Sequence, residues 1–319
     1  MKGTQPTAAN APRALIEDVL DLTPVGTDSN TFTNTKPLWR PPGNRGIFGG
    51  IVIAQTLAAA QRTAPADAAA TSMHCYFVLA GDGEVPILYH VDRVADHPGK
   101  AVRAVRAKQG ERLIFTAMLN FSSLLDVGSG RGLERSVPVP AADLPPPDEG
   151  DGAWDSDRPF QSLSAGFVRD VPNPEDKKIR QWARARGPIS PSGGKCVHLG
   201  ALAYMTDSFL LGTVYRAHSV PRFSSPTALR RLAGLKAHPD PDREALHYFQ
   251  SLADMEASEL RGCRADSEDV CADEWMLSEM ETPWAGDGRG LVTSRWWSRD
   301  GRLIATCVQE GVMRLKARY

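Results

Sequence analysis

The sequence contains an internal repeat, and one position that is leucine in the first copy is glutamine in the second. Residues 110–116 are echoed by residues 301–306, and the aligned Arg-Leu-Ile runs place Gln309 opposite Leu119. A polar side chain at a position that looks buried carries a desolvation cost, so it usually has a partner or a function. Gln309 is therefore a candidate for holding a water molecule through its carbonyl oxygen. The alternative is a glutamine on an edge strand that bonds backbone groups.

A carboxylate shows the same contrast. Residues 50–57 are similar to residues 200–207, and this alignment places Asp207 opposite Leu57. A carboxylate on a largely apolar helix can accept a proton from water if burial raises its pKa toward neutrality. The alternative for Asp207 is a structural role, either capping a helix or pairing across an interface between two units.

Each copy is predicted to contain one buried helix and several strands that would position these side chains. Residues 49–63 predict a helix that is apolar nearly all round and hence buried, with Gln55 as its one strong polar interruption. Strand-like runs follow at residues 72–79, 85–94, 101–107 and 113–121. The second copy has a helix at 197–211 and strand-like runs at 160–171, 274–281, 291–298 and 303–314. Charged residues 173–186, anchored by Trp182, are predicted to lie at the surface.

The expected domain organisation follows from these copies and from the composition between them. Residues 1–13 predict a flexible tail, and residues 14–124 the first unit, which opens with a short helix. Residues 125–157 are rich in Gly, Pro, Ser and acidic side chains and predict a linker. Residues 158–319 form the second unit. A buried helix followed by antiparallel strands implies, in each unit, a sheet wrapped around a central helix.

Composition excludes several classes of protein. The formal net charge of -1 disfavours a general nucleic-acid binder, and no apolar run reaches the roughly 20 residues that cross a bilayer. The five cysteines are scattered and odd in number, which favours reduced thiols. Neither they nor the seven histidines show metal-ligand spacing, so no metal is expected. The first residues lack a signal-peptide pattern and the last are not a Ser-Lys-Leu type address, which predicts a cytoplasmic protein.

Four motifs together resemble the acyl-CoA thioesterase II (TesB-like) family, whose members carry two hotdog folds in tandem. They are Phe48-Gly49-Gly50 with the helix after it, residues 72–77, residues 203–207 and residues 308–314. The resemblance implies an α+β double hotdog, in which two antiparallel sheets are each wrapped around a central helix and packed as a pseudo-dimer. It covers most of both predicted units.

The resemblance also implies catalytic roles. In the family, an Asp on the second helix, a Gln on the last strand and a Thr or Ser on an intervening strand orient the attacking water. Asp207 and Gln309 match the first two residues. For the third, an ungapped match places Met255 where the hydroxyl belongs, and Ser251 and Ser258 are the candidate substitutes. Either of these serines is otherwise an ordinary loop residue.

Substrate contacts are expected from the helix starts and from neighbouring strands. Gly49 and Gly50 precede a buried helix, whose free N–H groups favour an oxyanion. Tyr204 and His74 are further candidates for binding substrate, although His74, in a strand, also fits a core histidine. Arg103 and Arg106 are candidates for contacting CoA phosphates, with solvated strand arginines as the alternative.

The sequence thus predicts an enzyme that hydrolyses acyl-CoA to free acid and CoA, without a cofactor beyond the CoA of its substrate. Assembly into homo-oligomers is expected by analogy with the family. A rival hypothesis is a non-hydrolytic double-hotdog protein that binds or transforms an acyl or polyketide-like intermediate, because no residue matches the third hydroxyl. A third alternative is that residues 251–270 reflect an error in the gene model.

Overall fold

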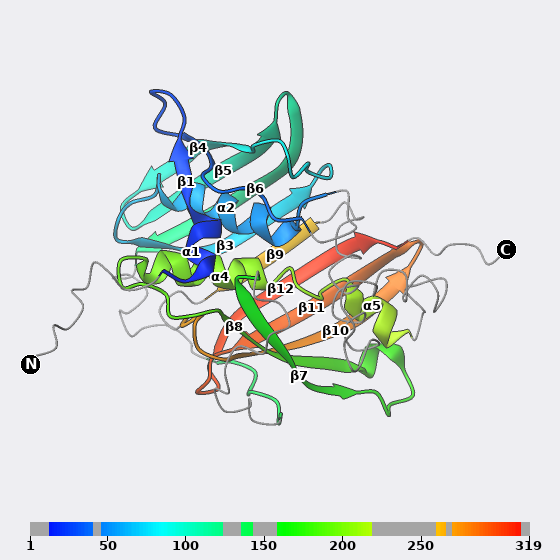
Figure 1. Cartoon of the computed structure of the whole chain (residues 1–319). Helices are drawn as coiled ribbons and strands as arrows, with labels where there is room; N and C mark the ends of the chain where they lie inside the picture. Colours follow the sequence, from blue (N-terminus) through cyan, green and yellow to red (C-terminus); the bar gives the residue numbers. More distant parts are fainter. Residues whose placement is uncertain are drawn as a thin grey trace, which may run out of the picture.

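One antiparallel sheet of 12 strands forms the body of the molecule in the computed structural model (Figure 1). The structure describes residues 13–40, 46–123, 135–142, 158–218 and 270–313, and the backbone of residues 260–265. The first unit contains α1 (Leu15–Leu20), β1 (Leu22–Pro24), β2 (Thr31–Asn34), α2 (Gly49–Gln61), β3 (Ala68–Phe77), β4 (Leu88–His97), β5 (Lys100–Gln109) and β6 (Arg112–Ser123). The second unit contains β7 (Phe160–Val168), η2 (Pro174–Asp176), β8 (Lys178–Ala185), α4 (Gly194–Met205), α5 (Gly212–Ala217), β9 (Leu260–Ala265), β10 (Met276–Gly286), β11 (Arg289–Trp297) and β12 (Leu303–Val312).

Strand order shows that the chain folds as two similar halves. The order is β1-β2-β4-β5-β6-β3-β9-β12-β11-β10-β8-β7, so β3 and β9 meet in the middle and β6 corresponds to β12. Leu119 on β6 and Gln309 on β12 therefore occupy equivalent strands, as the repeated Arg-Leu-Ile run predicts. Gly110 and Gly301 precede these strands in tight turns with φ values of 58° and 86°, a conformation that favours glycine.

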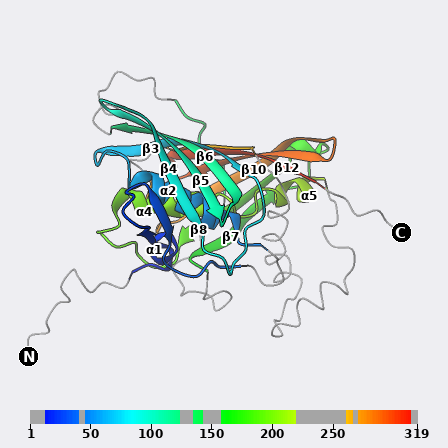
Figure 2. The ribbon, with the colours of Figure 1, turned by 90° about the horizontal axis from the view of Figure 1, so that it is seen from above.

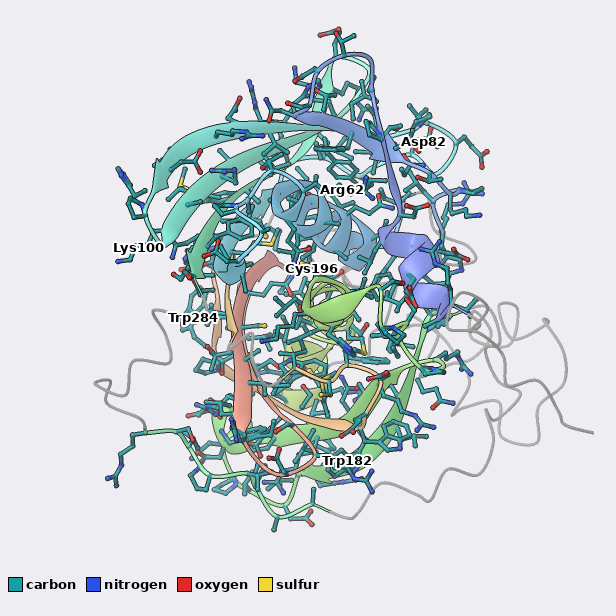
Figure 3. The ribbon with its side chains drawn as sticks, turned by 90° about the vertical axis from the view of Figure 1, so that its left-hand side faces the viewer. Arg62, Asp82, Lys100, Trp182, Cys196 and Trp284 are labelled. Carbon is teal, nitrogen blue, oxygen red and sulfur yellow. The ribbon has the colours of Figure 1, made fainter. Side chains whose placement is uncertain are left out.

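The helices lie on one side of this sheet (Figure 2), and side chains fill the space between helices and strands (Figure 3). α2 and α4 pack against each other in the middle of the molecule. Both side-chain polar atoms of Gln55, the polar interruption in α2, have hydrogen-bond partners: its Oε1 accepts from the Tyr89 hydroxyl at 2.7 Å, and its Nε2 donates to the Val19 carbonyl at 2.7 Å. These contacts explain how an amide is accommodated in a buried apolar helix.

The second helix ends earlier than the sequence predicts. α4 stops at Met205, and residues 206–211 form a turn before α5. Asp207 therefore lies beyond the helix, whereas Leu57 lies inside α2. The prediction that Asp207 lies on the second helix is wrong, because the helix ends two residues before it. The turn is buried throughout and ends in three apolar residues, so hydrophobic pattern does not mark where the helix stops.

The surface position predicted for residues 173–186 is confirmed for η2, which has no buried residue, and is wrong for β8. β8 pairs with β7 on one side and β10 on the other, and Ile179 and Ala183 are buried. Trp182 is buried, as expected of an anchor. Charged side chains beside these residues find partners, such as Arg180, whose Nε lies 2.7 Å from Oε2 of Glu279. Because charged residues are frequent in this segment, its sequence does not indicate a buried strand.

Arg103 on β5 is 1% exposed, so the interpretation as a solvated arginine is wrong. Its Nε donates to Oγ1 of Thr63 at 3.0 Å, and its Nη2 donates to the Thr63 carbonyl at 2.7 Å. Nη2 also lies 2.6 Å from Oδ1 of Asp96. Alternation along β5 turns this residue inward, which removes it from any contact with CoA phosphates.

Part of the predicted linker lies against the second unit. Within residues 135–142, the Val137 carbonyl accepts a hydrogen bond from Nε1 of Trp297 at 3.1 Å, and the Ala141 carbonyl accepts one from Arg180 at 2.8 Å. The remaining residues of 125–157 lie outside the described ranges. We keep the proposed domain boundaries as predictions.

A buried carboxylate on α1 connects the two halves. Glu17 is 4% exposed and accepts hydrogen bonds from the backbone N–H of Ser190 at 2.8 Å, the Ser190 hydroxyl at 2.6 Å and the Ala14 N–H at 3.1 Å. Burial alone would raise the pKa of Glu17. The hydrogen bonds from Ser190 and Ala14, with the charge of Arg13, outweigh burial and lower this pKa below its ordinary value of 4.5.

Replacing Glu17 by glutamine is expected to lower the free energy of unfolding by about 1–3 kcal/mol at neutral pH, because charge-assisted hydrogen bonds are lost. Since the folded-state pKa is depressed, this contribution is complete above pH 4.5 and fades as the pH falls through the folded-state value. Urea unfolding of both proteins at several pH values measures the difference. The exposed neighbour Asp18, changed to asparagine, is the control. A difference that stays constant down to pH 3 contradicts this expectation.

Candidate functional site

Asp207 lies where the end of α4 meets the beginning of α2. Its side chain is 1% exposed, and a Cβ built on Gly49 would stand 2.7 Å from its Oδ2. Gly49 is the first residue of α2, and the N-cap residue Phe48 makes no capping hydrogen bond with its own side chain. The N–H groups of a first helical turn and the helix dipole favour negative charge. The structure thus places a buried carboxylate beside a helix N-terminus that belongs to the other half of the molecule.

The two glycines at this helix start permit different close approaches. A Cβ on Gly50 would stand 2.5 Å from the carbonyl oxygen of Tyr204 and 2.3 Å from Cε1 of Phe48. A Cβ on Gly49 would instead meet only the ends of side chains, those of Asp207 and of Phe77 at 2.9 Å. Gly50 therefore allows α2 to touch the α4 backbone, and Gly49 makes room for the carboxylate.

We expect these adjacent glycines to give opposite phenotypes when changed to alanine. Gly50→Ala presses on backbone and is expected to cost about 1–3 kcal/mol of stability. Gly49→Ala displaces the Asp207 side chain, so stability changes little while turnover falls on the order of a hundredfold. Thermal unfolding and kcat measured on both variants test the pair. Equal effects of the two variants on both quantities would contradict this assignment.

The turn that carries Asp207 holds an unusual backbone conformation. Phe209 has a φ of 66°, in the left-handed region, although its side chain is bulky and 4% exposed. Such a residue costs free energy and persists only where its surroundings enforce it. Phe209 packs with Leu210 and Val292 in an apolar cluster, which supplies that enforcement. The turn is therefore fixed against the inner face of the second half.

Gln309 lies on the same inner face. β12 runs between β11 and β9, so the alternative of an edge-strand glutamine is wrong. Gln309 is 0% exposed and its Cα partner across the ladder is Val292, whose side chain packs with Phe209. Neither Oε1 nor Nε2 of Gln309 has a hydrogen-bond partner among the described residues. A buried amide of this kind carries a desolvation penalty, which is typical of a group reserved for a ligand or water.

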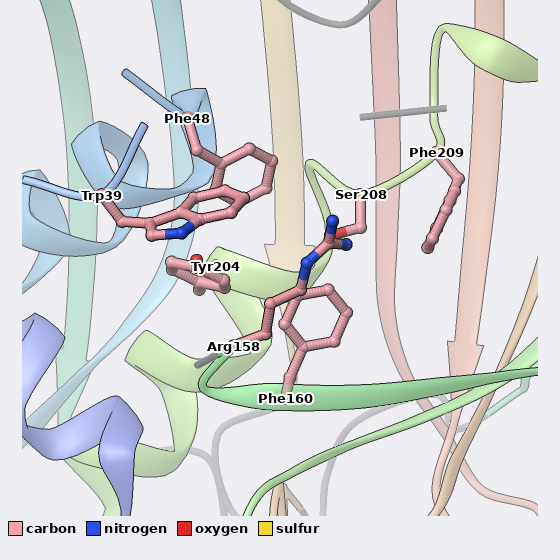
Figure 4. Close-up of a pocket in the computed structure, with 7 residues that line it drawn as sticks. All are labelled: Trp39, Phe48, Arg158, Phe160, Tyr204, Ser208 and Phe209. Carbon is pink, nitrogen blue, oxygen red and sulfur yellow. The ribbon is translucent and has the colours of Figure 1, made fainter. Parts of the chain in front are cut away.

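An aromatic pocket adjoins Asp207 at the boundary between the halves (Figure 4). It is lined by Trp39, Phe48, Arg158, Phe160, Tyr204, Ser208 and Phe209. The ring of Tyr204 lies 4.9 Å from that of Phe48 and 5.8 Å from that of Phe160, measured between centroids. The guanidinium carbon of Arg158 lies 5.4 Å from the Trp39 ring centre. Both halves thus contribute walls to one pocket.

Comparison with known proteins decides the family. A family model described as the acyl-CoA thioesterase N-terminal domain matches residues 36–122, and one described as the C-terminal domain matches residues 138–313. The chain belongs to the acyl-CoA thioesterase family. Acyl-coenzyme A thioesterase 8 of Mus musculus is 32% identical over 95% of this chain and 89% of its own length.

Solved structures agree with the acyl-CoA thioesterase assignment. The acyl-CoA thioesterase II TesB2 of Mycobacterium marinum is 25% identical, with a TM-score of 0.67 over 95% of this chain and 100% of that one. A hot dog fold protein of Alicyclobacillus acidocaldarius, 16% identical over 95% of this chain and 98% of its own, has a TM-score of 0.53 and supports the fold alone. The predicted α+β double-hotdog fold and the predicted thioesterase family are confirmed.

Several predicted site residues of this acyl-CoA thioesterase family member come together. Asp207, Gly49, Gly50 and Tyr204 meet where α2 and α4 approach each other. Gln309 lies in the adjoining interior. Ser251 and Ser258 lie outside the described residues.

His74 does not lie at the site where α2 and α4 approach each other. Its side chain is exposed on the outer face of β3, while its neighbours Met73 and Cys75 point inward and are buried. The interpretation as a core histidine is wrong for the same reason, since strand alternation turns it outward.

Sequence reasoning missed most of the pocket in this family member. Trp39, Arg158, Phe160 and Ser208 come from segments far apart in the chain, and no spacing marks them as neighbours. The one available signal was Ser208, a polar residue directly after Asp207 in an apolar stretch. Within the described ranges no cluster of three or more His, Cys, Asp or Glu side chains has metal-binding geometry. Nor does any helix in them have the length and apolar character needed to cross a membrane.

Proposed function

We propose that this protein hydrolyses an acyl-CoA thioester to the free acid and CoA, using a water molecule held by Asp207 and Gln309. The observation that carries the proposal is the burial of these two polar side chains, with the Asp207 carboxylate against the N-terminus of α2 and the Gln309 amide without a hydrogen-bond partner among the described residues. Family membership supports thioester hydrolysis as the reaction.

The chemistry follows from the properties of these groups. Asp207 accepts a proton from water as the water oxygen attacks the thioester carbonyl carbon. The oxyanion that forms is stabilised by N–H groups of the first turn of α2, whose N-cap residue Phe48 offers them no side-chain acceptor. The C–S bond then breaks, and the proton passes from Asp207 to the thiolate, which leaves as CoA. Gln309 orients the water by accepting its second O–H at Oε1.

Hydrolysis of a panel of acyl-CoAs, with detection of the released thiol, tests the proposal. We expect release of one thiol per acyl group from at least one chain length. Failure to cleave any member of the panel would contradict the proposed function.

A non-hydrolytic double-hotdog protein is the second candidate. It is favoured by one observation: no hydroxyl in the sequence matches the position of the third family residue, where an ungapped match places Met255. Under this hypothesis an acyl-CoA binds tightly and is recovered intact. Isothermal titration with the same panel distinguishes the two candidates.

The proposal requires neither a metal nor an organic cofactor, because CoA enters as part of the substrate. We also propose that the protein acts in the reducing environment of the cytoplasm, which the odd number of cysteines supports. We also propose that copies of the chain associate into a homo-oligomer, by analogy with the fold. Light scattering coupled to size-exclusion chromatography measures that association.

A further inference from the structure

One hydrogen-bonding position of the attacking water in the proposed mechanism has no side chain assigned to it. A water molecule donates two hydrogen bonds and has two lone pairs. Asp207 and Oε1 of Gln309 take the two O–H groups, and one lone pair must face the thioester carbon. The second lone pair can accept a hydrogen bond, and a donor placed there would fix the remaining freedom of the water to rotate. The third group is therefore expected to be a buried hydroxyl with an unused proton.

Ser208 has these properties. It directly follows Asp207, is 5% exposed and lines the pocket shown in Figure 4. Its Oγ is buried and has no hydrogen-bond partner among the described residues. Buried hydroxyls are nearly always paired, and leaving one unpaired costs free energy. An unpaired hydroxyl in the wall of a pocket is therefore ready to bind a molecule that enters it.

The local backbone places Ser208 within reach of the same helix end as Asp207. Phe48 lies in the wall of the pocket with Ser208, and the next residue, Gly49, lies against the Asp207 carboxylate. The positive φ of Phe209, which directly follows these two consecutive polar residues, belongs to a backbone conformation that the surroundings must enforce. The free space between the pocket side chains is about 10 Å³, which suits a single water molecule.

Other buried hydroxyls near the site fit less well. Thr206 precedes Asp207, but its Oγ1 donates to the carbonyl of Ala203 at 2.8 Å and so closes the end of α4. Oγ1 of Thr56 is also buried without a hydrogen-bond partner among the described residues. It lies seven residues along α2 from Gly49, roughly 10 Å from the helix start. Neither residue lines the pocket.

We propose that Ser208 is the third water-binding residue of the site, and that its Oγ–H donates a hydrogen bond to the oxygen of the attacking water. This inference rests on the proposed function. The family resemblance places this third hydroxyl on a strand, whereas the proposal places it in the turn after α4. Ser208 transfers no proton in the reaction; it lowers the barrier by holding the water with one lone pair directed at the carbonyl carbon.

Ser208→Ala tests the proposal in the full-length protein. We expect kcat to fall on the order of tenfold or more on every acyl-CoA that the wild-type protein cleaves, with KM changed less than threefold. The melting temperature should stay the same or rise, because an unpaired buried hydroxyl is removed. Ser208→Thr, which keeps the hydroxyl, should recover part of the lost kcat.

Matched variants make the outcomes distinct. Thr206→Val removes a buried hydroxyl from the same turn and is expected to lower the melting temperature while leaving kcat within about threefold of wild type. If Ser208→Ala raises KM or lowers kcat only for some acyl chains, Ser208 contacts the acyl group and the proposal is overturned. An unchanged kcat overturns it too. If Asp207→Asn is inactive while Ser208→Ala is fully active, the inference on Ser208 fails and the proposed function stands. A wild-type protein that cleaves no acyl-CoA contradicts both the proposed function and the inference on Ser208.

Discussion

Asparagine at position 207 is expected to lower kcat by about two to four orders of magnitude without unfolding the protein. The substitution keeps the shape of the side chain against Gly49, where a carboxylate oxygen now lies. It removes the only acidic side chain at this boundary that the proposed chemistry uses to accept a proton from water. Steady-state kinetics on a cleaved acyl-CoA, with the melting temperature measured alongside, separates loss of the base from loss of the fold.

The control for this variant is an aspartate without a role in the site. Asp287 is exposed in the turn between β10 and β11, in a left-handed conformation that asparagine tolerates well. Asp287→Asn should match the wild type in both turnover and stability. If Asp207→Asn also keeps more than about a tenth of wild-type kcat, Asp207 is not the base.

Leucine in place of Gln309 is expected to lower kcat roughly a hundredfold or more while preserving or increasing stability. The residue would then match Leu119, which occupies the equivalent strand of the first half and is also 0% exposed. Because neither amide atom of Gln309 has a partner among the described residues, its removal relieves a desolvation penalty of about 1–3 kcal/mol. Activity and stability should therefore change in opposite directions, which is typical of a residue kept for function.

Urea unfolding and kcat measured on Gln309→Leu test this expectation together. The reverse change in the first half, Leu119→Gln, is the matched variant: it buries an amide beside Arg103 and should lower stability while leaving kcat close to wild type. A Gln309→Leu protein that is clearly less stable than the wild type would show that the amide is structural.

Much of this arrangement follows from the sequence because the signals are local. An apolar helix starting at Gly49, alternating strands and two glycine turns before equivalent strands predict two copies of one unit. Leu119 and Gln309 lie on equivalent strands in the structure, as the repeat predicts, because the repeated hairpins fix the register of both strands. Local pattern and tertiary position agree wherever an element is long and its turn is marked by glycine.

The remaining features depend on contacts between distant segments. The end of α4 at Met205 is set by the turn around Phe209, whose packing against Val292 comes from a strand more than eighty residues later. Arg103 is buried because Thr63 and Asp96 satisfy its donors, which charge alone does not reveal. The pocket is built from both halves, so no linear motif describes it.

The most direct measurement compares kcat for Asp207→Asn, Gln309→Leu and the protein that carries both changes. If the two side chains hold one water molecule, the double variant should be no slower than Asp207→Asn within about threefold, because residues that act as a unit lose their effect together. Losses that multiply across the two single variants would show that Asp207 and Gln309 act independently, and would contradict a shared water.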